Sequence, residues 1–231
     1  MDILIGQLFP GSGICRVLNE IPSQRKVNFL QQIFLLPEEL NLPDVTAKEY
    51  KQMYAAFYPT FRDDLWNTCV SEFEIETQDR LHKMSMGQKK KVAIALALSV
   101  QTPVLLMDEP TNALDIPSKA VFRKLVASCI GDEQMIIIST HQVRDLESLI
   151  DSVLILENHK ILLDCGLDEV SEKLFFRFVQ QGEQVLYAEP TSAGLMGVGE
   201  NKDQEHTDVY LELLFQAVTQ NPKEIKRIFN N

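Results

Sequence analysis

The sequence has few basic residues and no long apolar run. Its 231 residues carry 22 Lys and Arg against 33 Asp and Glu, a net charge of −11. A nucleic-acid-binding surface needs clustered basic side chains, so this charge argues against nucleic acid as a partner. No apolar stretch reaches the ~18 residues that span a bilayer, which argues against direct membrane insertion. Any membrane role must therefore come through a partner protein.

Clustered cysteines and a phosphate-binding loop are absent as well. The four cysteines lie far apart without C-x-x-C spacing, at Cys15, Cys69, Cys129 and Cys165. This pattern fits reduced thiols in the cytosol and gives no metal site. No G-x-x-x-x-G-K-[ST] occurs, and Gly11-Ser12-Gly13 lacks the lysine of that motif. The sequence therefore contains no loop of the kind that cradles the β- and γ-phosphates of a nucleotide.

Apolar runs of strand length alternate with helical patterns along most of the chain. The predicted strands are 33–36, 104–107 and 134–139. Residues 88–100 are apolar on nearly all sides, which indicates a buried helix, and 118–130 form a predicted crossover helix. The basic run Lys89-Lys90-Lys91 is interpreted as a solvated helix face. Strands that alternate with helices predict an α/β domain around a mainly parallel sheet.

A helical insert interrupts this rhythm over about residues 46–84. Thr46 and Glu49 predict a capping box at its first helix. The spacing of one helix face is shared by Tyr50, Met53, Tyr54 and Phe57. Such an aromatic stripe is far more often core packing than a ligand site, so we interpret it as packing. A second helix is predicted over 61–73.

The remaining segments give weaker patterns. We expect the end of an amphipathic helix at 1–8, a short strand at 14–18, a helix at 143–150 and strands at 153–156 and 160–163. The domain boundary is set after residue 165, which leaves a small α+β appendage over 166–231. In the appendage we expect a strand near 185–187, a loop over 194–203, a helix from Leu211 to Val218, and a last helix from Pro222.

Two acids end the apolar strand 104–107. A carboxylate at the end of a buried strand can hold Mg²⁺ against phosphates, and Asp108 is in that place. Glu109 points to the other side of the strand end, where it can polarise an attacking water. An acid pair alone is a weak signal, because a strand–loop junction with solvated acids has the same pattern.

Three further residues favour phosphate chemistry. Ser85 and Gly87 open a helix, and the free N–H groups and positive dipole end of a helix N-terminus suit a phosphate. An ordinary Ser-capped helix has the same pattern. His141 follows the strand 134–139, which should lie beside the strand of Asp108. The two side chains should therefore converge at one sheet edge.

Together these stretches resemble the motifs of the ATP-binding cassette (ABC) family. Residues 84–88 resemble the signature, 105–111 the Walker B segment, 113–115 the D-loop, and His141 the switch histidine. The resemblance runs over about residues 1–163. It implies a P-loop NTPase-like fold and an ATPase whose two subunits pair head to tail. ATP then lies between the P-loop of one subunit and the signature of the other.

The resemblance implies roles at the strand ends. Asp108 serves Mg²⁺, Glu109 is the general base, and His141 contacts the γ-phosphate. Glu38 stands where the family usually has the Q-loop glutamine. Because carboxylate and amide both offer oxygen, Glu38 can still serve Mg²⁺ or water.

The resemblance also implies roles at the signature. Ser85, Gly87 and Gln88 contact the nucleotide that the opposite subunit holds, and Asp115 links the two sites across the dimer. Met86 replaces the first glycine of the signature pair, so its side chain must point away from the phosphate.

The family has its P-loop just before the helix that residues 1–8 resemble. We therefore expect Met1 to be an internal methionine and this chain alone to be inactive. Our main interpretation is the ATP-hydrolysing subunit of an ABC transporter, with ATP and Mg²⁺ as cofactors. It would be cytoplasmic, held at the inner face of the membrane by a permease, and paired with a second, identical or different ABC ATPase subunit. Two alternatives stay open: a degenerate partner that only donates the signature, and a soluble non-transport ATPase of the same superfamily.

Overall fold

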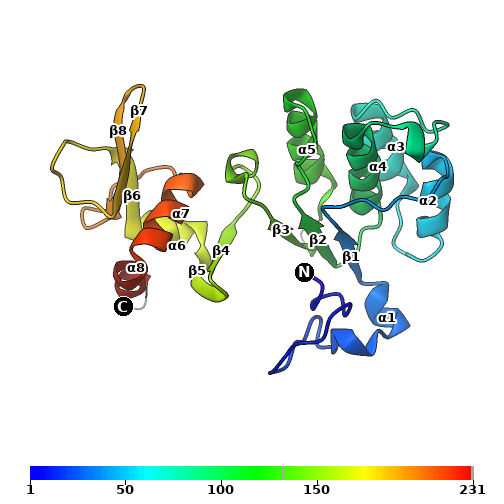
Figure 1. Ribbon diagram of the computed structural model, residues 1–231, viewed down its shortest axis with the longest axis horizontal. Coiled ribbons are helices and arrows are strands. Elements are labelled where there is room, and N and C mark those ends of the chain that lie inside the picture. The colour runs from blue at the N-terminus through cyan, green and yellow to red at the C-terminus, as the bar shows by residue number, and fades with distance from the viewer. Residues whose placement is uncertain (132, 230–231) are drawn as a thin grey trace. The chain divides into compact units, whose positions relative to one another are not determined.

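The computed structural model describes residues 1–131 and 133–229, and the chain divides into two compact units, Met1–Gln142 and Val143–Asn231 (Figure 1). This division differs from the predicted boundary after residue 165, because the hairpin before that residue belongs to the second unit. Its Ile155 and Leu163 are buried in one core with Leu214 and Val218. No helix in the part of the chain that is described is long and apolar enough to cross a membrane.

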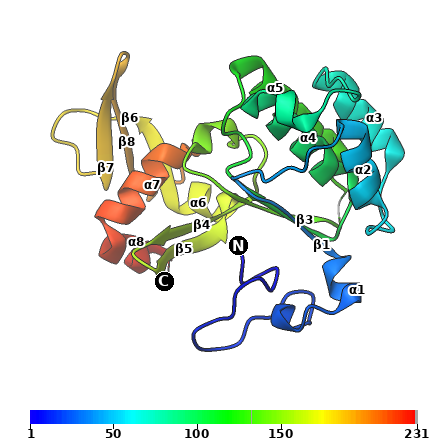
Figure 2. The same cartoon turned by 45° about the vertical axis from the view of Figure 1, so that its right-hand side comes forward.

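The first unit is built around a parallel sheet (Figures 1 and 2). Its elements are α1 (Val27–Leu30), β1 (Ile33–Leu36), α2 (Ala47–Ala55), α3 (Asp63–Glu72), α4 (Met86–Ser99), β2 (Val104–Asp108), α5 (Ile116–Cys129) and β3 (Met135–Ser139), with 3-10 turns at Pro22–Gln24 and Leu81–Lys83. Helices α4 and α5 cover one face of the sheet, and α1 with the N-terminal segment lies on the other (Figures 1 and 2). The predicted α/β architecture is confirmed.

The sheet has the order β1-β2-β3, and all its strands run parallel. In its register Leu36 lies opposite Met107, and Asp108 lies opposite Ser139. The central strand β2 is buried from Val104 to Met107, as a continuous apolar run predicts for a strand covered on both faces. Because parallel strands end at the same edge of a sheet, the segments that follow β1, β2 and β3 meet there.

The helical insert has the predicted capping box. The Thr46 hydroxyl accepts the Glu49 N–H at 3.2 Å, and the Glu49 carboxylate accepts the Thr46 N–H at 2.8 Å. The aromatic stripe packs only in part. Tyr50 is buried and Tyr54 meets the Phe34 ring edge-on, with centroids 6.2 Å apart, whereas Phe57 is 69% exposed.

The N-terminal segment differs from its prediction. Residues 1–8 form successive turns instead of a helix end, because Gly6 has φ +72° and packs directly on the carbonyl of Pro22. The strand predicted at 14–18 is a single bridge between Val17 and Glu20. The chain reverses between those two residues through left-handed Leu18 and Asn19, which ends any strand.

The second unit holds two antiparallel sheets and the helices packed on them. Its elements are β4 (Ser152–Glu157), β5 (Lys160–Gly166), α6 (Leu167–Lys173), β6 (Leu174–Phe178), β7 (Tyr187–Thr191), β8 (Gly194–Glu200), α7 (Leu211–Gln220) and α8 (Pro222–Phe229). Strands β4 and β5 form a hairpin, and the other sheet has the order β6-β8-β7. The hairpin turn at left-handed Asn158 and His159 and the two last helices are as predicted.

Two expectations for this unit are wrong. The segment 194–203, expected to be a loop, is mostly β8. This strand pairs with β6 on one side and β7 on the other, and this pairing holds it extended despite its glycines. The helix expected at 143–150 is a 3-10 turn, Val143–Asp145. There Glu147 accepts the Leu211 N–H at 3.2 Å, a tertiary contact that no helical pattern reports. Helix α6 and strand β6 were not predicted from the sequence.

We expect Leu106→Ala to lower the free energy of unfolding by about 2–5 kcal/mol, because its fully buried side chain would leave a cavity in the central strand. Urea denaturation followed by the fluorescence of buried Trp66 measures this loss. Val27→Ala is the matched control and should cost less than about 0.5 kcal/mol, since Val27 is 68% exposed. Equal losses in the two variants would contradict the burial of β2.

Candidate functional site

The carboxyl edge of the sheet gathers the acids that follow its strands. Asp108 is the last residue of β2, and its carboxylate accepts a hydrogen bond from the Ser139 hydroxyl of β3. This contact follows from the register, in which the two residues are direct neighbours. The edge thus fixes one carboxylate at the end of a buried strand.

Glu109 is held more tightly than its neighbour. Its φ of +43° is left-handed, and its N–H donates to the Ser139 carbonyl at 2.9 Å. Its carboxylate accepts the Thr140 hydroxyl at 3.0 Å and the His141 N–H at 3.0 Å, and lies 2.7 Å from the His141 Nδ1. The Glu109 side chain is 14% exposed and that of His141 69%. The structure therefore brings Glu109 and His141 together, with the imidazole open to solvent.

Lys90 lies beneath this edge and corrects the interpretation of the basic run. It is 2% exposed instead of solvated, and its ammonium donates to the carbonyl oxygens of Pro37 at 3.4 Å and Glu38 at 3.2 Å. Burial lowers the pKa of Lys90, and the carboxylates of Glu38, Asp108 and Glu109 act against that shift. A cation buried in α4 thus faces the acids of the sheet edge.

The signature residues form the start of α4. Ser85 is the N-cap, whose Oγ accepts the Gln88 N–H at 3.2 Å, while the Gln88 side chain accepts the Ser85 N–H at 2.9 Å. A Cβ on Gly87 would lie 2.9 Å from the Ala113 carbonyl oxygen, so only glycine allows this close approach. The start of α4 therefore packs directly against the 113–115 segment.

A groove of about 410 Å³ opens between these two segments. Its lining includes Ser85, Gly87 and Gln88, with Lys91 and Asp115 facing it from either side. Asp115 caps α5 by accepting the Ser118 N–H at 2.9 Å, and the hydrogen bonds from Ser118 lower its pKa. This groove combines a helix N-terminus, a hydroxyl and a lysine, which are groups that suit an anion.

The predicted site residues thus fall into two groups. Glu38, Asp108, Glu109 and His141 lie at the sheet edge, and Ser85, Gly87, Gln88 and Asp115 line the groove at the start of α4. Among the residues described, no three His, Cys, Asp or Glu side chains gather to hold a metal. Magnesium commonly takes one or two carboxylates together with phosphate and water, and the carboxylates of Asp108 and Glu38 are ligands of that type.

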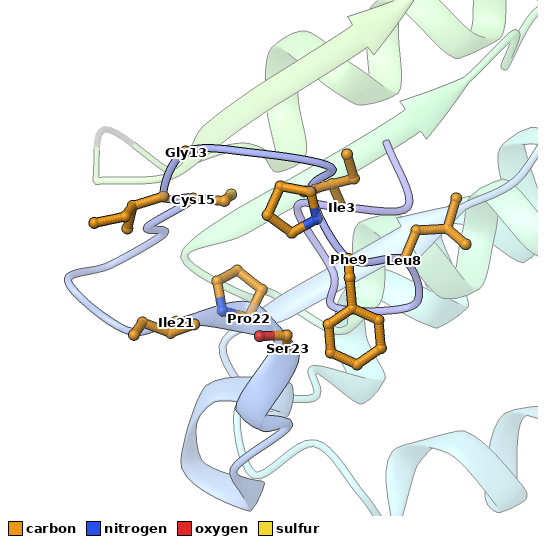
Figure 3. Close-up of a pocket in the computed structure, with 10 residues that line it drawn as sticks. Ile3, Leu8, Phe9, Gly13, Cys15, Ile21, Pro22 and Ser23 are labelled. Atoms are coloured by element: carbon orange, nitrogen blue, oxygen red, sulfur yellow. The ribbon is translucent and has the colours of Figure 1, made fainter.

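A separate hollow lies in the N-terminal segment (Figure 3). Its volume is about 320 Å³, and no charged side chain lines it. Ile3, Leu8, Phe9 and Ile21 give it an apolar wall. Among its described lining residues, Cys15 and Ser23 alone have a polar side chain, which is too few to hold a phosphate or a metal, so the hollow is not part of the candidate site.

Several residues of the site were missed from the sequence. Ser139 ends β3 and Thr140 follows it, and this position at the carboxyl edge of the sheet was itself a signal. Lys90 is a charge inside an otherwise apolar helix, which the run of three lysines concealed. Asn112 donates to Glu38 at 3.0 Å, and Gln142 donates to Asn112 at 2.9 Å. Neither carries a motif of its own, because side-chain amides serve many structural purposes.

A parallel sheet with an acid-bearing carboxyl edge and a helical insert defines an α/β protein of the P-loop NTPase type. The solved structure of an ATP-binding subunit of an ABC transporter superposes with a TM-score of 0.66 at 23% identity, over 73% of each chain. At that identity the likeness shows the fold.

Sequence comparisons identify the family. The ABC transporter family model matches residues 1–112. The ABC transporter ATP-binding protein NatA of Bacillus subtilis is 32% identical over 74% of this chain and 73% of its own length. The chain therefore belongs to the family of ABC transporter ATP-binding proteins. It spans about half (53%) of YtrB, another B. subtilis member, which is 25% identical over 67% of this chain.

We expect Gly87→Ala to destabilise the protein by about 1–3 kcal/mol, because the new methyl group meets a backbone oxygen that must move. The sign is informative, since glycine to alanine within a free helix normally stabilises it. Thermal unfolding measures the effect. Gly11→Ala is the control, with no atom within 4 Å of its Cβ, and a similar loss there would refute the steric explanation.

Proposed function

We propose that this chain is the ATP-hydrolysing subunit of an ABC transporter and powers a separate permease at the cytoplasmic face of the membrane. Family membership supports this role. The observation that carries it is the Glu109 carboxylate, which is 14% exposed, held by Thr140 and His141, and placed directly after Asp108 at the end of β2. A carboxylate fixed in this way can take a proton from an attacking water without having to reorganise.

The sheet edge would act on the γ-phosphate. Asp108 and Glu38 would hold Mg²⁺, which when bound offsets charge on the phosphate oxygens. Glu109 would orient the water and accept its proton. His141, whose imidazole is 69% exposed while its Nδ1 meets Glu109, would present its other ring nitrogen to a γ-phosphate oxygen.

The groove at α4 would serve a second nucleotide-binding subunit, identical or different, paired head to tail. The Ser85 Oγ accepts the Gln88 N–H, which leaves the hydroxyl proton free to donate to a phosphate oxygen. Gly87 adds a helix N-terminus without a side chain in the way. Asp115, on the rim of the groove, would make the contact between the two sites.

One observation favours a second candidate, a partner that donates the signature and hydrolyses nothing. The 231 residues contain no G-x-x-x-x-G-K-[ST] motif. The two candidates share the groove at α4 and differ in whether Glu109 does chemistry. A substitution at Glu109 therefore distinguishes them.

We expect Glu109→Gln to reduce ATP hydrolysis at least about a hundredfold, because the amide keeps the shape and loses the base. The assay uses the membrane complex purified through a tag on this chain, with ATP binding measured in the same preparation. Binding should persist while turnover is lost.

The control is Glu76→Gln, which removes an equal charge from an exposed position in the helical insert. It should leave hydrolysis unchanged. Wild-type turnover in the Glu109→Gln complex would remove Glu109 from the chemistry and favour the signature-donor function instead.

A further inference from the structure

Four side chains from four segments form one continuous line of hydrogen bonds. The Lys119 ammonium donates to the Gln142 Oε1 at 2.8 Å. The Gln142 Nε2 donates to the Asn112 Oδ1 at 2.9 Å, and the Asn112 Nδ2 donates to the Glu38 Oε1 at 3.0 Å. Glu38, Asn112 and Gln142 each follow a different strand, so the line ties the loops after β1, β2 and β3 to the first turn of α5.

The chemistry of the two ends fixes the direction of this line. A lysine ammonium can only donate, and a carboxylate can only accept. Gln142 must therefore turn its oxygen to Lys119 and its NH₂ to Asn112, and Asn112 must turn its NH₂ to Glu38. One orientation of the two amides satisfies all three bonds, and turning either amide would break at least one.

The line also ends beside the groups of the proposed reaction. Gln142 follows His141, and its N–H donates at 2.9 Å to the Thr140 hydroxyl, which in turn donates to Glu109. Glu38 is the residue proposed to serve Mg²⁺ together with Asp108. The Glu38 carboxylate is thus joined to the segment that holds Glu109 through side chains that have only one mutual arrangement.

We propose that Asn112 and Gln142 are positioning residues that hold the Glu38 carboxylate in register with Glu109 and His141. This inference rests on the proposed function. Neither residue touches the reacting atoms. They act through Glu38. Their effect depends on each hydrogen bond of the line running in the same direction, from Lys119 towards Glu38.

That polarity supplies a sharp test. Gln142→Glu keeps the size of the side chain and its bond to Lys119, but the new carboxylate cannot donate to Asn112. If Asn112 turns over to donate to residue 142, its oxygen then faces the Glu38 carboxylate. One bond is lost in either arrangement. We expect kcat for ATP hydrolysis to fall about tenfold with KM little changed.

The matched test makes the same substitution in a Glu38→Gln background. Glutamine is the residue that the family usually has at this position. A glutamine at position 38 can accept from Asn112, as the carboxylate does, or turn and donate to it. In that background Gln142→Glu lets both bonds of Asn112 reverse while Lys119 still donates to residue 142, so no bond is lost. We therefore expect it to change kcat less than about twofold relative to Glu38→Gln alone.

Two readouts decide the matter. Hydrogen exchange of the amides of residues 38–40 in the isolated chain should rise on Gln142→Glu with Glu38 present, and stay level in the Glu38→Gln background. Kinetics of the membrane complex should show the same dependence in kcat. An equal effect of Gln142→Glu on hydrogen exchange in both backgrounds overturns the proposal, and so does an equal effect on kcat once Glu109→Gln has been shown to abolish turnover. Because the exchange measurement needs no hydrolysis, it stands even if Glu109→Gln shows that this chain does no chemistry.

Discussion

The parallel pairing of β2 between β1 and β3 is the constraint on which the candidate site depends. Parallel strands deliver their carboxyl ends to one edge, and the register sets Asp108 against Ser139 there. Residues separated by up to about a hundred positions in sequence then become neighbours. No local preference of the loops brings Glu38, Glu109 and His141 to one edge. The sheet does so, and its stability comes from the apolar run that buries β2.

Glu109 shows how the edge is fixed energetically. A non-glycine residue in the left-handed region costs about 1–3 kcal/mol. Hydrogen bonds to a charged group each contribute about 1.5–3 kcal/mol, and the Glu109 carboxylate accepts them from Thr140 and from the His141 backbone. The bonds outweigh the strain, so the backbone is held where a relaxed loop would not place it. This is the fixed geometry that a general base requires.

Much of this was predictable, for identifiable reasons. The strands of the first unit, α4 and the Thr46 capping box follow from local periodicity and end signals, which act within a few residues. The positions of the motif residues at the sheet edge and at the start of α4 were also predictable. Lys90, Asn112 and Gln142 were not, because their roles depend on which loops the sheet brings together. The predictions for residues 1–8 and 143–150 were wrong because tertiary contacts at Gly6 and Glu147 override the local pattern.

The two groups of site residues differ in electrostatic character, and this supports a composite site. The sheet edge collects the carboxylates of Glu38, Asp108 and Glu109 over a buried ammonium. A polyphosphate is repelled by such acids unless a divalent cation lies between them, which is consistent with the Mg²⁺ proposed there. The groove at α4 offers an anion a helix N-terminus and Lys91, with Asp115 also in its lining. The sheet edge thus suits a metal-bound phosphate, and the groove suits the phosphate itself. In the proposed head-to-tail dimer, each nucleotide would meet the sheet edge of one subunit and the groove of the other.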